Sequence, residues 1–240
     1  MTGILFISDL HLEDARPETT RWLQGFLQGP ARKAEALYIL GDLFEYWIGD
    51  DAPSATAVEV AAGLTDLGRA GVPSYFMHGN RDFLLGEDYA ASAGLQLLPE
   101  TRVADLYGTP TLLLHGDTLC TDDTEYQAIR RRVRNPEWQA AVLALPVPER
   151  LRMAREARDA SMQHTGSATE AIMDVNGTAV RKAFTAHGVT RMIHGHTHRP
   201  ARHRHRLEDG SHAERIVLAD WYRSGSYLRV TPEGAESIEL

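Results

Sequence analysis

The sequence predicts an α/β fold in which buried strands alternate with helices. Short apolar runs recur along the chain, and polar residues follow each of them directly. Intervals of roughly 20 to 30 residues separate several of these runs, which leaves room for crossover helices. A chain of 240 residues is long enough to bury a full core, and we expect one catalytic domain with an elaboration.

The first half of the chain contains three predicted strands and two predicted helices. The strands are residues 4–7, 36–40 and 74–77, and the helices are residues 20–28 and 55–67. The strand segments are apolar without alternation, which is typical of strands covered on both faces. The strands lead into candidate ligands, namely Asp9 and His11, then Asp42, then Asn80.

The second half repeats this pattern after a long interruption. Residues 111–114 and 191–193 are largely apolar and lead into His115-Gly116-Asp117 and His194-Gly195-His196-Thr197-His198. Residues 217–221 and 226–230 are expected to be closing strands. In open α/β sheets, ligands gather beyond the carboxyl ends of strands, so we expect the polar groups to meet at one edge.

The residue types at these strand ends indicate a metal centre. Aspartate, histidine and one asparagine amide, with no thiolate, suit Mn²⁺, Fe²⁺ or Zn²⁺ rather than a cysteine-rich structural zinc, and Mn²⁺ is our first choice. The set is too large for one tetrahedral ion but divides well between two ions about 3.5 to 4 Å apart if Asp42 bridges them. The predicted catalytic and metal-binding residues are Asp9, His11, Asp42, Asn80, His115, His196 and His198.

The charges of such a centre favour phosphate chemistry. Two divalent ions, two carboxylates and a bridging hydroxide leave about one positive charge if the histidines are neutral, so the centre attracts an anion. Metal binding lowers the pKa of water from 15.7 to about 7, which makes hydroxide available as a nucleophile near neutral pH.

Each motif has a simpler explanation when it is taken alone. Gly41-Asp42 and Gly79-Asn80 are typical of turns, and an isolated Asp-x-His is usually a turn residue beside an incidental histidine. Only the succession of these motifs at separate strand ends indicates a metal site. The histidines at 78, 164, 187, 203, 205 and 212 are interpreted as ordinary structural residues.

Residues 122–188 contain helix signals and no clear strand. One of residues 122–124 can cap a first helix, Pro136 suits the first turn of a second, and prolines 146 and 148 break the pattern before a third at 149–163. We expect a helical cap over the metals, because this segment lies between candidate ligands. The predicted division is a core of residues 1–121 and 189–240 with a cap insertion of residues 122–188.

The net charge of −8 conceals a basic segment. Residues 126–158 hold eight arginines and three acidic residues, so this segment carries +5 and the rest of the chain −13. Solvated helix faces are the simplest explanation, and an anionic partner, either a phosphorylated ligand or an anionic lipid surface, is the alternative. Nucleic acid is disfavoured, because the remainder is acidic and no nucleic-acid-binding motif is present.

The composition also restricts the compartment. Cys120 is the only cysteine, so no internal disulfide can form. The first residues include neither a basic leader nor a long apolar stretch, and no segment approaches the ~18 apolar residues of a spanning helix. We therefore expect a cytoplasmic protein whose membrane contact is peripheral.

The series of motifs resembles the calcineurin-like metallophosphoesterase family from one end of the chain to the other. The resemblance implies an αββα sandwich, in which two mixed sheets are flanked by helices. It also implies two metal sites, one formed by Asp9, His11, Asp42 and His198 and the other by Asp42, Asn80, His115 and His196. Many members have a histidine after the Gly-Asn pair; this chain has Arg81, so no catalytic histidine is assumed there.

Longer stretches resemble the subgroup of this family that hydrolyses UDP-2,3-diacylglucosamine in lipid A synthesis. They are residues 6–12, 41–51, 79–83, 115–123 and 172–176. The resemblance implies attack of a metal-bridging hydroxide at the α-phosphorus, giving UMP and 2,3-diacylglucosamine 1-phosphate. The substrate contacts that it implies are Asn80, Arg81, Asp123, Ser161 and His196, together with Thr165 and Ala168, which replace an asparagine and a lysine of the best-known members.

The partner implied by this resemblance is a UDP-linked diacylated sugar lipid. The basic cap would collect it as a peripheral protein on the cytoplasmic face of the inner membrane. Arg81 can bind two diphosphate oxygens through its planar guanidinium, although a surface salt bridge is the simpler role. Residues Leu143, Leu145, Leu151 and Met153 are interpreted either as an acyl-facing wall or as helix core.

Two other functions fit the same motifs. One is a different dinuclear phosphodiesterase or phosphomonoesterase, and the other is a non-enzymatic scaffold that kept the fold. The scaffold is disfavoured because a scaffold is expected to lose ligands, and here every candidate ligand is present. The sequence predicts no oligomeric state.

Overall fold

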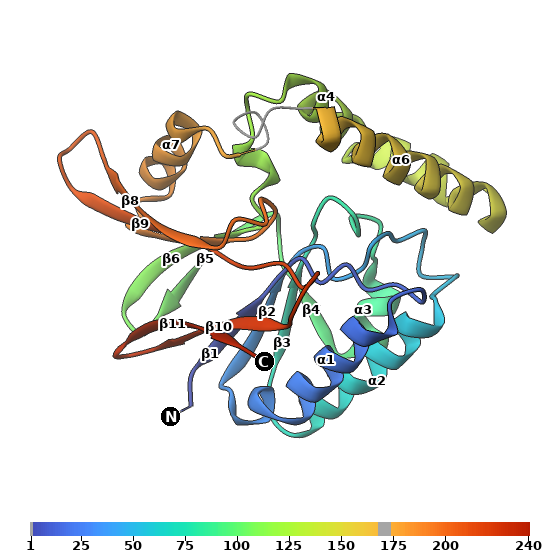
Figure 1. The fold of residues 1–240 in the computed structure, drawn as a ribbon, viewed down its shortest axis with the longest axis horizontal. Helices are drawn as coiled ribbons and strands as arrows, with labels where there is room; N and C mark the ends of the chain where they lie inside the picture. The colour runs from blue at the N-terminus through green and yellow to red at the C-terminus, as the bar shows by residue number, and fades with distance from the viewer. Residues whose placement is uncertain (1, 168–173) are drawn as a thin grey trace.

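Two β-sheets lie face to face in the computed structural model, which describes the backbone of residues 2–167 and 174–240 (Figure 1). Side chains are described for residues 2–161 and 174–240. Helices cover the outer faces of both sheets, and a further group of helices lies beyond one end of the sandwich. The predicted α/β sandwich of two mixed sheets is therefore confirmed.

The first sheet has six strands in the order β11-β10-β1-β2-β3-β4. Four parallel strands, β1 (Ile4–Ile7), β2 (Ala36–Leu40), β3 (Ser74–Met77) and β4 (Leu95–Leu97), are followed at one edge by the antiparallel β10 (Ser226–Thr231) and β11 (Gly234–Glu239). Helices α1 (Pro17–Gln28), α2 (Ala55–Arg69) and α3 (Glu87–Ala93) cover the outer face, and a 3-10 turn, Pro30–Lys33, follows α1.

The second sheet has five strands in the order β5-β6-β7-β9-β8. They are β5 (Thr101–Leu106), β6 (Thr109–Leu114), β7 (Arg191–His194), β8 (Ala201–Arg206) and β9 (His212–Val217). Helix α7 (Gly177–His187) packs against this sheet, and its buried residues Val180 and Phe184 join the hydrophobic cluster that this sheet forms. A short 3-10 turn, Asp117–Leu119, follows β6.

The side chains of β1 alternate between two hydrophobic clusters. Leu5 and Ile7 pack with the helices on the outer face, and Phe6 packs between the sheets. Because both faces are buried, the strand needs apolar residues at every position, which explains the unbroken apolar segment in the sequence. Full burial of such a side chain contributes about 1.5–3 kcal/mol, and this fixes the register of the strands that present the site.

Three helices form the cap beyond the end of the sandwich, on the side away from the N-terminus (Figure 1). They are α4 (Thr124–Val133), α5 (Pro136–Leu143) and α6 (Val147–Ser167). Asp123 caps α4 by accepting from the Tyr126 N–H, and Pro136 occupies the first turn of α5, as predicted. Pro148 lies inside the first turn of α6, where a missing N–H is tolerated, so the expected break at this proline was wrong.

The prediction of a strand over residues 217–221 was also wrong. Only Val217 belongs to β9, which begins five residues earlier. The apolar residues that follow are buried in a loop, in which the Trp221 N–H donates to the Asp9 carbonyl at 3.0 Å and the indole packs edge-on against Phe26. Strands β8 and β9 were not predicted, because they carry many arginine and histidine residues and form no apolar run; β8 is an edge strand, where charged residues are tolerated.

The division into core and cap insertion remains our proposal. Arginines of α4 and α6 contact the core, whereas the segment after residue 173 returns to the second sheet, where α7 shares its core. Within the described residues, no helix is both long and apolar enough to cross a membrane.

Candidate metal centre

Most of the predicted ligands have a strained backbone. Among the described residues, six non-glycine residues have a positive φ, and five of these are Asp9, His11, Asp42, His196 and His198, with φ between 50 and 69°. This conformation costs a residue with a side chain about 1–3 kcal/mol and is tolerated where the surrounding structure enforces it. Such strain is typical of functional sites, because it directs side chains of neighbouring loops towards one point.

One group of ligand atoms lies beyond the end of β1. Asp9, His11 and His198 each present an atom within 4.8 Å of the others. The Nε2 atoms of His11 and His198 are 3.3 Å apart, and the Nε2 of His198 is 3.4 Å from the Asp9 carboxylate. Asp9 is fully buried and accepts from the Ser8 hydroxyl at 2.6 Å and from the His196 N–H at 2.9 Å.

A second group lies beside the first, beyond the ends of β2, β3, β6 and β7. The Oδ1 atom of Asn80 is 2.9 Å from His115 Nε2 and 2.8 Å from His196 Nδ1. Asp42, His115 and Asp9 also present atoms within 4.8 Å of one another. The structure thus brings all seven predicted ligands together at one edge of the sandwich.

Asp42 lies between the two groups. Its Oδ2 is 3.9 Å from His11 Nε2 and 3.7 Å from His115 Nε2, and its Oδ1 accepts from the Arg81 backbone N–H at 2.8 Å. A carboxylate in this position can reach an ion in either group. This placement supports the prediction that Asp42 is the shared ligand.

The donor atoms fit a cation. The Nδ1 of His115 is 2.8 Å from the Leu40 carbonyl, so the hydrogen of a neutral ring lies on that nitrogen. Its Nε2 then presents a lone pair to the Asn80 oxygen, which is itself an acceptor. Two acceptors this close repel one another unless both bind a cation, and a divalent ion held by these residues would supply that charge.

The electrostatics of the buried groups point the same way. Burial lowers the pKa of His115, but the nearby carboxylates of Asp42 and Asp9 outweigh it, and the pKa of this ring is raised. Burial together with the proximity of His115 lowers the pKa of His196 to about 4, so this ring is neutral near pH 7. The carboxylates thus create a negative potential that suits a cation. The neutral ring of His196 keeps one nitrogen lone pair available to it.

Several supporting residues were not singled out from the sequence. Asp82 is fully buried and accepts from the backbone N–H groups of Leu43, at 2.7 Å, and Gly79, at 2.8 Å. It thereby ties the Asp42 loop to the Asn80 loop, and burial and the neighbouring Asp42 raise its pKa to about 6. A charged residue next to a ligand motif is the only sequence signal for this role.

A tyrosine and a buried histidine also support the centre. The Tyr222 ring stacks on the His11 ring, with centroids 5.1 Å apart and planes 8° apart, and Arg16 lies over the Tyr222 ring. His194 is fully buried beneath the ligand loop, and its Nδ1 lies 2.8 Å from the Gly195 carbonyl. Tyr222 belongs to no motif whose spacing indicates a ligand. His194 directly precedes Gly195-His196-Thr197-His198, and this position is its only sequence signal.

Three of the predicted substrate-binding residues, Arg81, Asp123 and Ser161, lie outside the two ligand groups and are described with their side chains. Arg81 belongs to the core, and its Nη2 donates to the Ser161 hydroxyl of α6 in the cap at 3.2 Å. Asp123 is buried at the start of α4, where its carboxylate acts as the helix cap. Thr165 belongs to the part of α6 whose side chains are not described, and Ala168 lies outside the described residues.

The basic segment divides into two classes of arginine. Arg130, Arg134, Arg150 and Arg158 reach acceptors of the core, including Asp117, the Gly79 carbonyl, Asp51 and Glu45. Arg131, Arg132, Arg152 and Arg155 are exposed. Half of the arginines thus attach the cap to the core, and the other half face solvent.

The predicted acyl-facing residues are not buried core. Leu143 is 40% exposed, and Leu145, Leu151 and Met153 are partly buried. In the same region the rings of Phe83 and Trp138 lie 6.2 Å apart, and the Arg134 guanidinium lies over Phe83.

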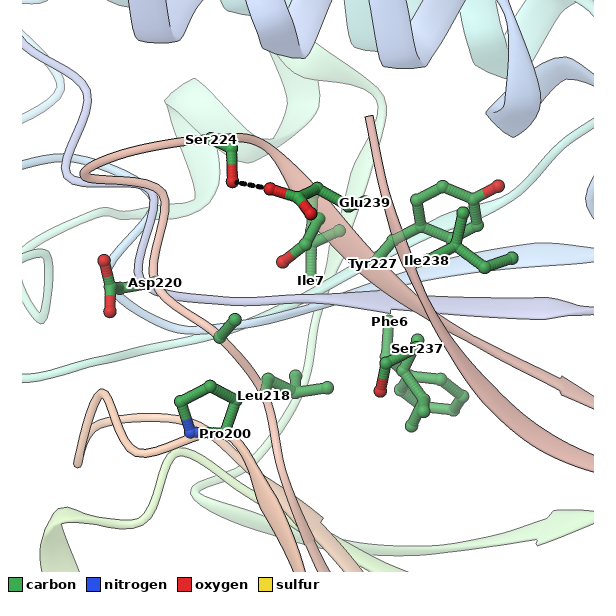
Figure 2. Close-up of a pocket in the computed structure, with 13 residues that line it drawn as sticks. Phe6, Ile7, Pro200, Leu218, Asp220, Ser224, Tyr227, Ser237, Ile238 and Glu239 are labelled. Atoms are coloured by element: carbon green, nitrogen blue, oxygen red, sulfur yellow. Dashed lines mark hydrogen bonds between the residues drawn. The ribbon is translucent and has the colours of Figure 1, made fainter.

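The structure also contains a cavity of about 310 Å³, whose lining residues are drawn in Figure 2. Its walls come from β1, from the loop before β10, and from β10 and β11, and they include apolar residues such as Leu218 and Ile238. At its rim the Ser224 hydroxyl donates to Glu239 at 2.6 Å. The candidate ligands are absent from its lining, so this cavity is not the metal centre.

Sequence comparisons with known proteins point to one family. The Calcineurin-like phosphoesterase family matches residues 2–200. A UDP-2,3-diacylglucosamine hydrolase of Serratia proteamaculans is 52% identical over 98% of both chains. Hydrolases of the same name from Xanthomonas axonopodis pv. citri and Stenotrophomonas maltophilia are 51% and 53% identical, over 98% and 96% of this chain and 98% and 95% of theirs.

Solved structures are similar at much lower identity. The protein TT1561 of Thermus thermophilus is 13% identical with a TM-score of 0.48, over 100% of this chain and 99% of that chain. Yfce, a phosphoesterase from E. coli, is 16% identical with a TM-score of 0.43, over 95% and 87%. From the family match and the identity to the curated relatives, the chain belongs to the calcineurin-like phosphoesterase family.

Proposed function

We propose that this chain hydrolyses the diphosphate of UDP-2,3-diacylglucosamine at the α-phosphorus in lipid A biosynthesis. The products are UMP and 2,3-diacylglucosamine 1-phosphate. We further propose that the two groups of ligand atoms hold two Mn²⁺ ions. The observation that carries the proposal is the convergence of all seven ligands around Asp42, in a chain about half identical to hydrolases of that name.

Some residues of the chain would bind the metal ions, and others would bind the substrate. Bound divalent ions supply Lewis acidity and lower the pKa of water, so that a nucleophile is available near neutral pH. Asp9, His11 and His198 would hold one ion, Asn80, His115 and His196 the other, and Asp42 both. The strained backbone fixes these groups in advance, so little reorganisation accompanies the reaction.

Arg81 is our candidate for binding the diphosphate. Its backbone N–H holds Asp42 at 2.8 Å, which places its side chain beside the metal centre. A planar guanidinium can form two parallel hydrogen bonds to phosphate oxygens and stabilise the charge that builds on them. Its hydrogen bond to Ser161 shows that α6 of the cap lies close to the metal centre. We therefore assign the sugar and its acyl chains to the space beneath α6.

We place the protein on the cytoplasmic face of the inner membrane as a peripheral protein. Exposed arginines 131, 132, 152 and 155 and exposed apolar residues Ile129, Leu143 and Val147 lie on the cap helices. A surface of this composition suits anionic lipids, because basic side chains bind head groups and apolar side chains enter the interface.

The test is UMP release from UDP-2,3-diacylglucosamine, compared with UDP-sugars that lack acyl chains. We expect a strong preference for the acylated substrate, and equal rates would remove the lipid assignment. The same assay on metal-free protein supplied with Mn²⁺, Mg²⁺ or Zn²⁺ tests the choice of metal. Hydrolysis of bis-p-nitrophenyl phosphate alone would indicate the alternative, another dinuclear phosphodiesterase, and no hydrolysis of either ester would indicate a scaffold.

A further inference from the structure

Glu45 lies between a candidate metal ligand and the cap. It is buried, with 5% of its surface exposed, and follows the Asp42 loop. One carboxylate oxygen, Oε2, is 3.1 Å from His11 Nδ1, and the other, Oε1, is 2.9 Å from Arg158 Nε. The carboxylate therefore contacts the core and the cap at once.

The contact with Glu45 determines which nitrogen of His11 is available to a metal. His11 Nε2 faces the metal centre, at 3.3 Å from the corresponding nitrogen of His198. Its Nδ1 lies 3.1 Å from the Glu45 carboxylate, an ion-pair contact without the angle of a hydrogen bond. In the neutral ring this nitrogen carries the hydrogen, because a carboxylate accepts and does not donate. Carboxylates that orient a ligating histidine in this way raise its basicity, and their loss typically costs 10–100-fold in metal affinity.

Arg158 holds Glu45 from the side of the cap. It lies on α6, and its terminal nitrogens are 3.3 and 3.4 Å from the oxygens of Glu13. The planar guanidinium thus spans two carboxylates of the core, and it fixes Glu45 with one oxygen towards Arg158 and the other towards His11.

We propose that Glu45 is a positioning residue that orients His11, and that Arg158 acts through it to make metal affinity depend on a contact from the cap. The proposal rests on the metal centre described under the proposed function. Because coupling between two sites is reciprocal, metal binding in turn strengthens the attachment of α6 to the core.

Simple electrostatics predicts the opposite change in metal affinity when Arg158 is removed. A positive charge two contacts away from a bound cation repels it, so removal of Arg158 would strengthen metal binding. The positioning role predicts weaker binding instead, because Glu45 loses its fixed orientation. The sign of the change therefore separates the two.

The experiment measures Mn²⁺ affinity without substrate. The full chain is stripped with a chelator and titrated with Mn²⁺, and the free ion is followed by electron paramagnetic resonance. We expect Glu45→Ala to weaken binding about 10–100-fold, Glu45→Gln to have an intermediate effect, and Arg158→Ala to weaken binding less than Glu45→Ala. Arg158→Lys should restore part of the loss, and Arg158→Ala should add nothing in the Glu45→Ala background.

Arg150→Ala is the matched control. Arg150 also attaches α6 to the core, through Asp51 at 2.7 Å and the Ile48 carbonyl, but neither acceptor contacts a candidate ligand. We expect this variant to bind Mn²⁺ within about twofold of the unaltered chain, since the Arg158–Glu45 contact stays in place. Circular dichroism of each metal-free variant checks that the fold is retained.

Three results would overturn the proposal. They are unchanged or tighter binding in Arg158→Ala, additive effects of Glu45→Ala and Arg158→Ala, and a loss in Arg150→Ala as large as that in Arg158→Ala. Failure of the unaltered chain to bind Mn²⁺ would overturn the metal centre as well. If Mn²⁺ affinity depends on Glu45 and Arg158 as expected but the chain releases no UMP, only the proposed substrate is contradicted.

Discussion

At the scale of single residues, the candidate metal centre depends on loops that approach one another without side chains between them. A Cβ atom on Gly195 would overlap the carboxylate of Asp9 and the hydroxyl of Ser8, and one on Gly79 would overlap Asp42. Glycine is required at both positions because the ligand atoms fill the space that a methyl group needs. The glycines of the Gly-Asn and Gly-His-x-His motifs therefore have a packing reason as well as a turn-forming one.

Gly195→Ala is expected to impair metal binding. The methyl group forces Asp9 and Ser8 apart, and we expect Mn²⁺ affinity to fall by at least about tenfold, as for loss of a residue that orients a ligand. Gly68→Ala is the matched control, because Gly68 lies in α2 with nothing within 4 Å of an added Cβ. Mn²⁺ titration of both variants tests this, and equal affinities would show that the loops can separate without cost.

Asp42→Ala is expected to abolish turnover and reduce the metal content. The carboxylate lies between the two ligand groups, so its loss affects both ions. Metal content after dialysis, together with UMP release, measures the effect, and Asp66→Ala, which removes an exposed carboxylate paired only with Arg69 in the described chain, is the control. Normal stoichiometry with a retained rate would contradict the shared role of Asp42.

At the scale of elements, arginines attach the cap to the ligand-bearing loops. Arg130 of α4 donates to the buried Asp117 at 2.7 Å, and Asp117 lies two residues after His115. Burial opposes the ionisation of Asp117, but His115, His196 and Arg130 hold its pKa below the usual range. Arg130 is thus the contribution of α4 to a buried charge that histidines of the core also stabilise.

Arg130→Met is expected to destabilise the fold by about 3–5 kcal/mol, because it leaves a buried carboxylate without its charged partner. Urea unfolding of the metal-free protein measures the change. Arg131→Met is the control, since the neighbouring Arg131 is exposed. If the two variants unfold at the same urea concentration, the contact of Arg130 with Asp117 contributes nothing to stability.

At the scale of the whole molecule, the metal centre joins loops from both sheets. Asp9, Asp42 and Asn80 follow strands of the first sheet, and His115 and His196 follow strands of the second. Ions held by both sets would connect the two halves of the sandwich. Binding to the folded state alone also raises stability by mass action.

Removal of metal is therefore expected to lower the unfolding temperature. At a free Mn²⁺ concentration of 100 times Kd, each ion contributes about 2.7 kcal/mol, which corresponds to roughly 5–10 °C in a chain of this size. Differential scanning calorimetry with chelator, and then with Mn²⁺ restored, measures the shift. The shift should be reduced in Asp42→Ala, and identical curves with and without Mn²⁺ would contradict the metal centre.

Much of the fold followed from local pattern. Strands β1, β2, β3, β6 and β7 are largely apolar because both of their faces are buried. Capping residues and Pro136 predicted the start of helices α4 and α5. Strands β8 and β9 escaped prediction because an edge strand and its neighbour tolerate arginine and histidine. The loop at 218–221 looked like a strand because tertiary packing buries Leu218 and Trp221 outside any sheet.

The chemistry of the candidate site could be inferred from the order of residues alone, because ligand type and position along the chain are local properties that follow from strands ending at a common edge. The groups that support those ligands emerged from the folded arrangement. Glu45, Asp82, Tyr222 and Arg158 acquire their roles from contacts across the fold, such as that between Arg158 and Glu45. Such contacts depend on how the sheets and cap pack, and no spacing along the chain specifies them.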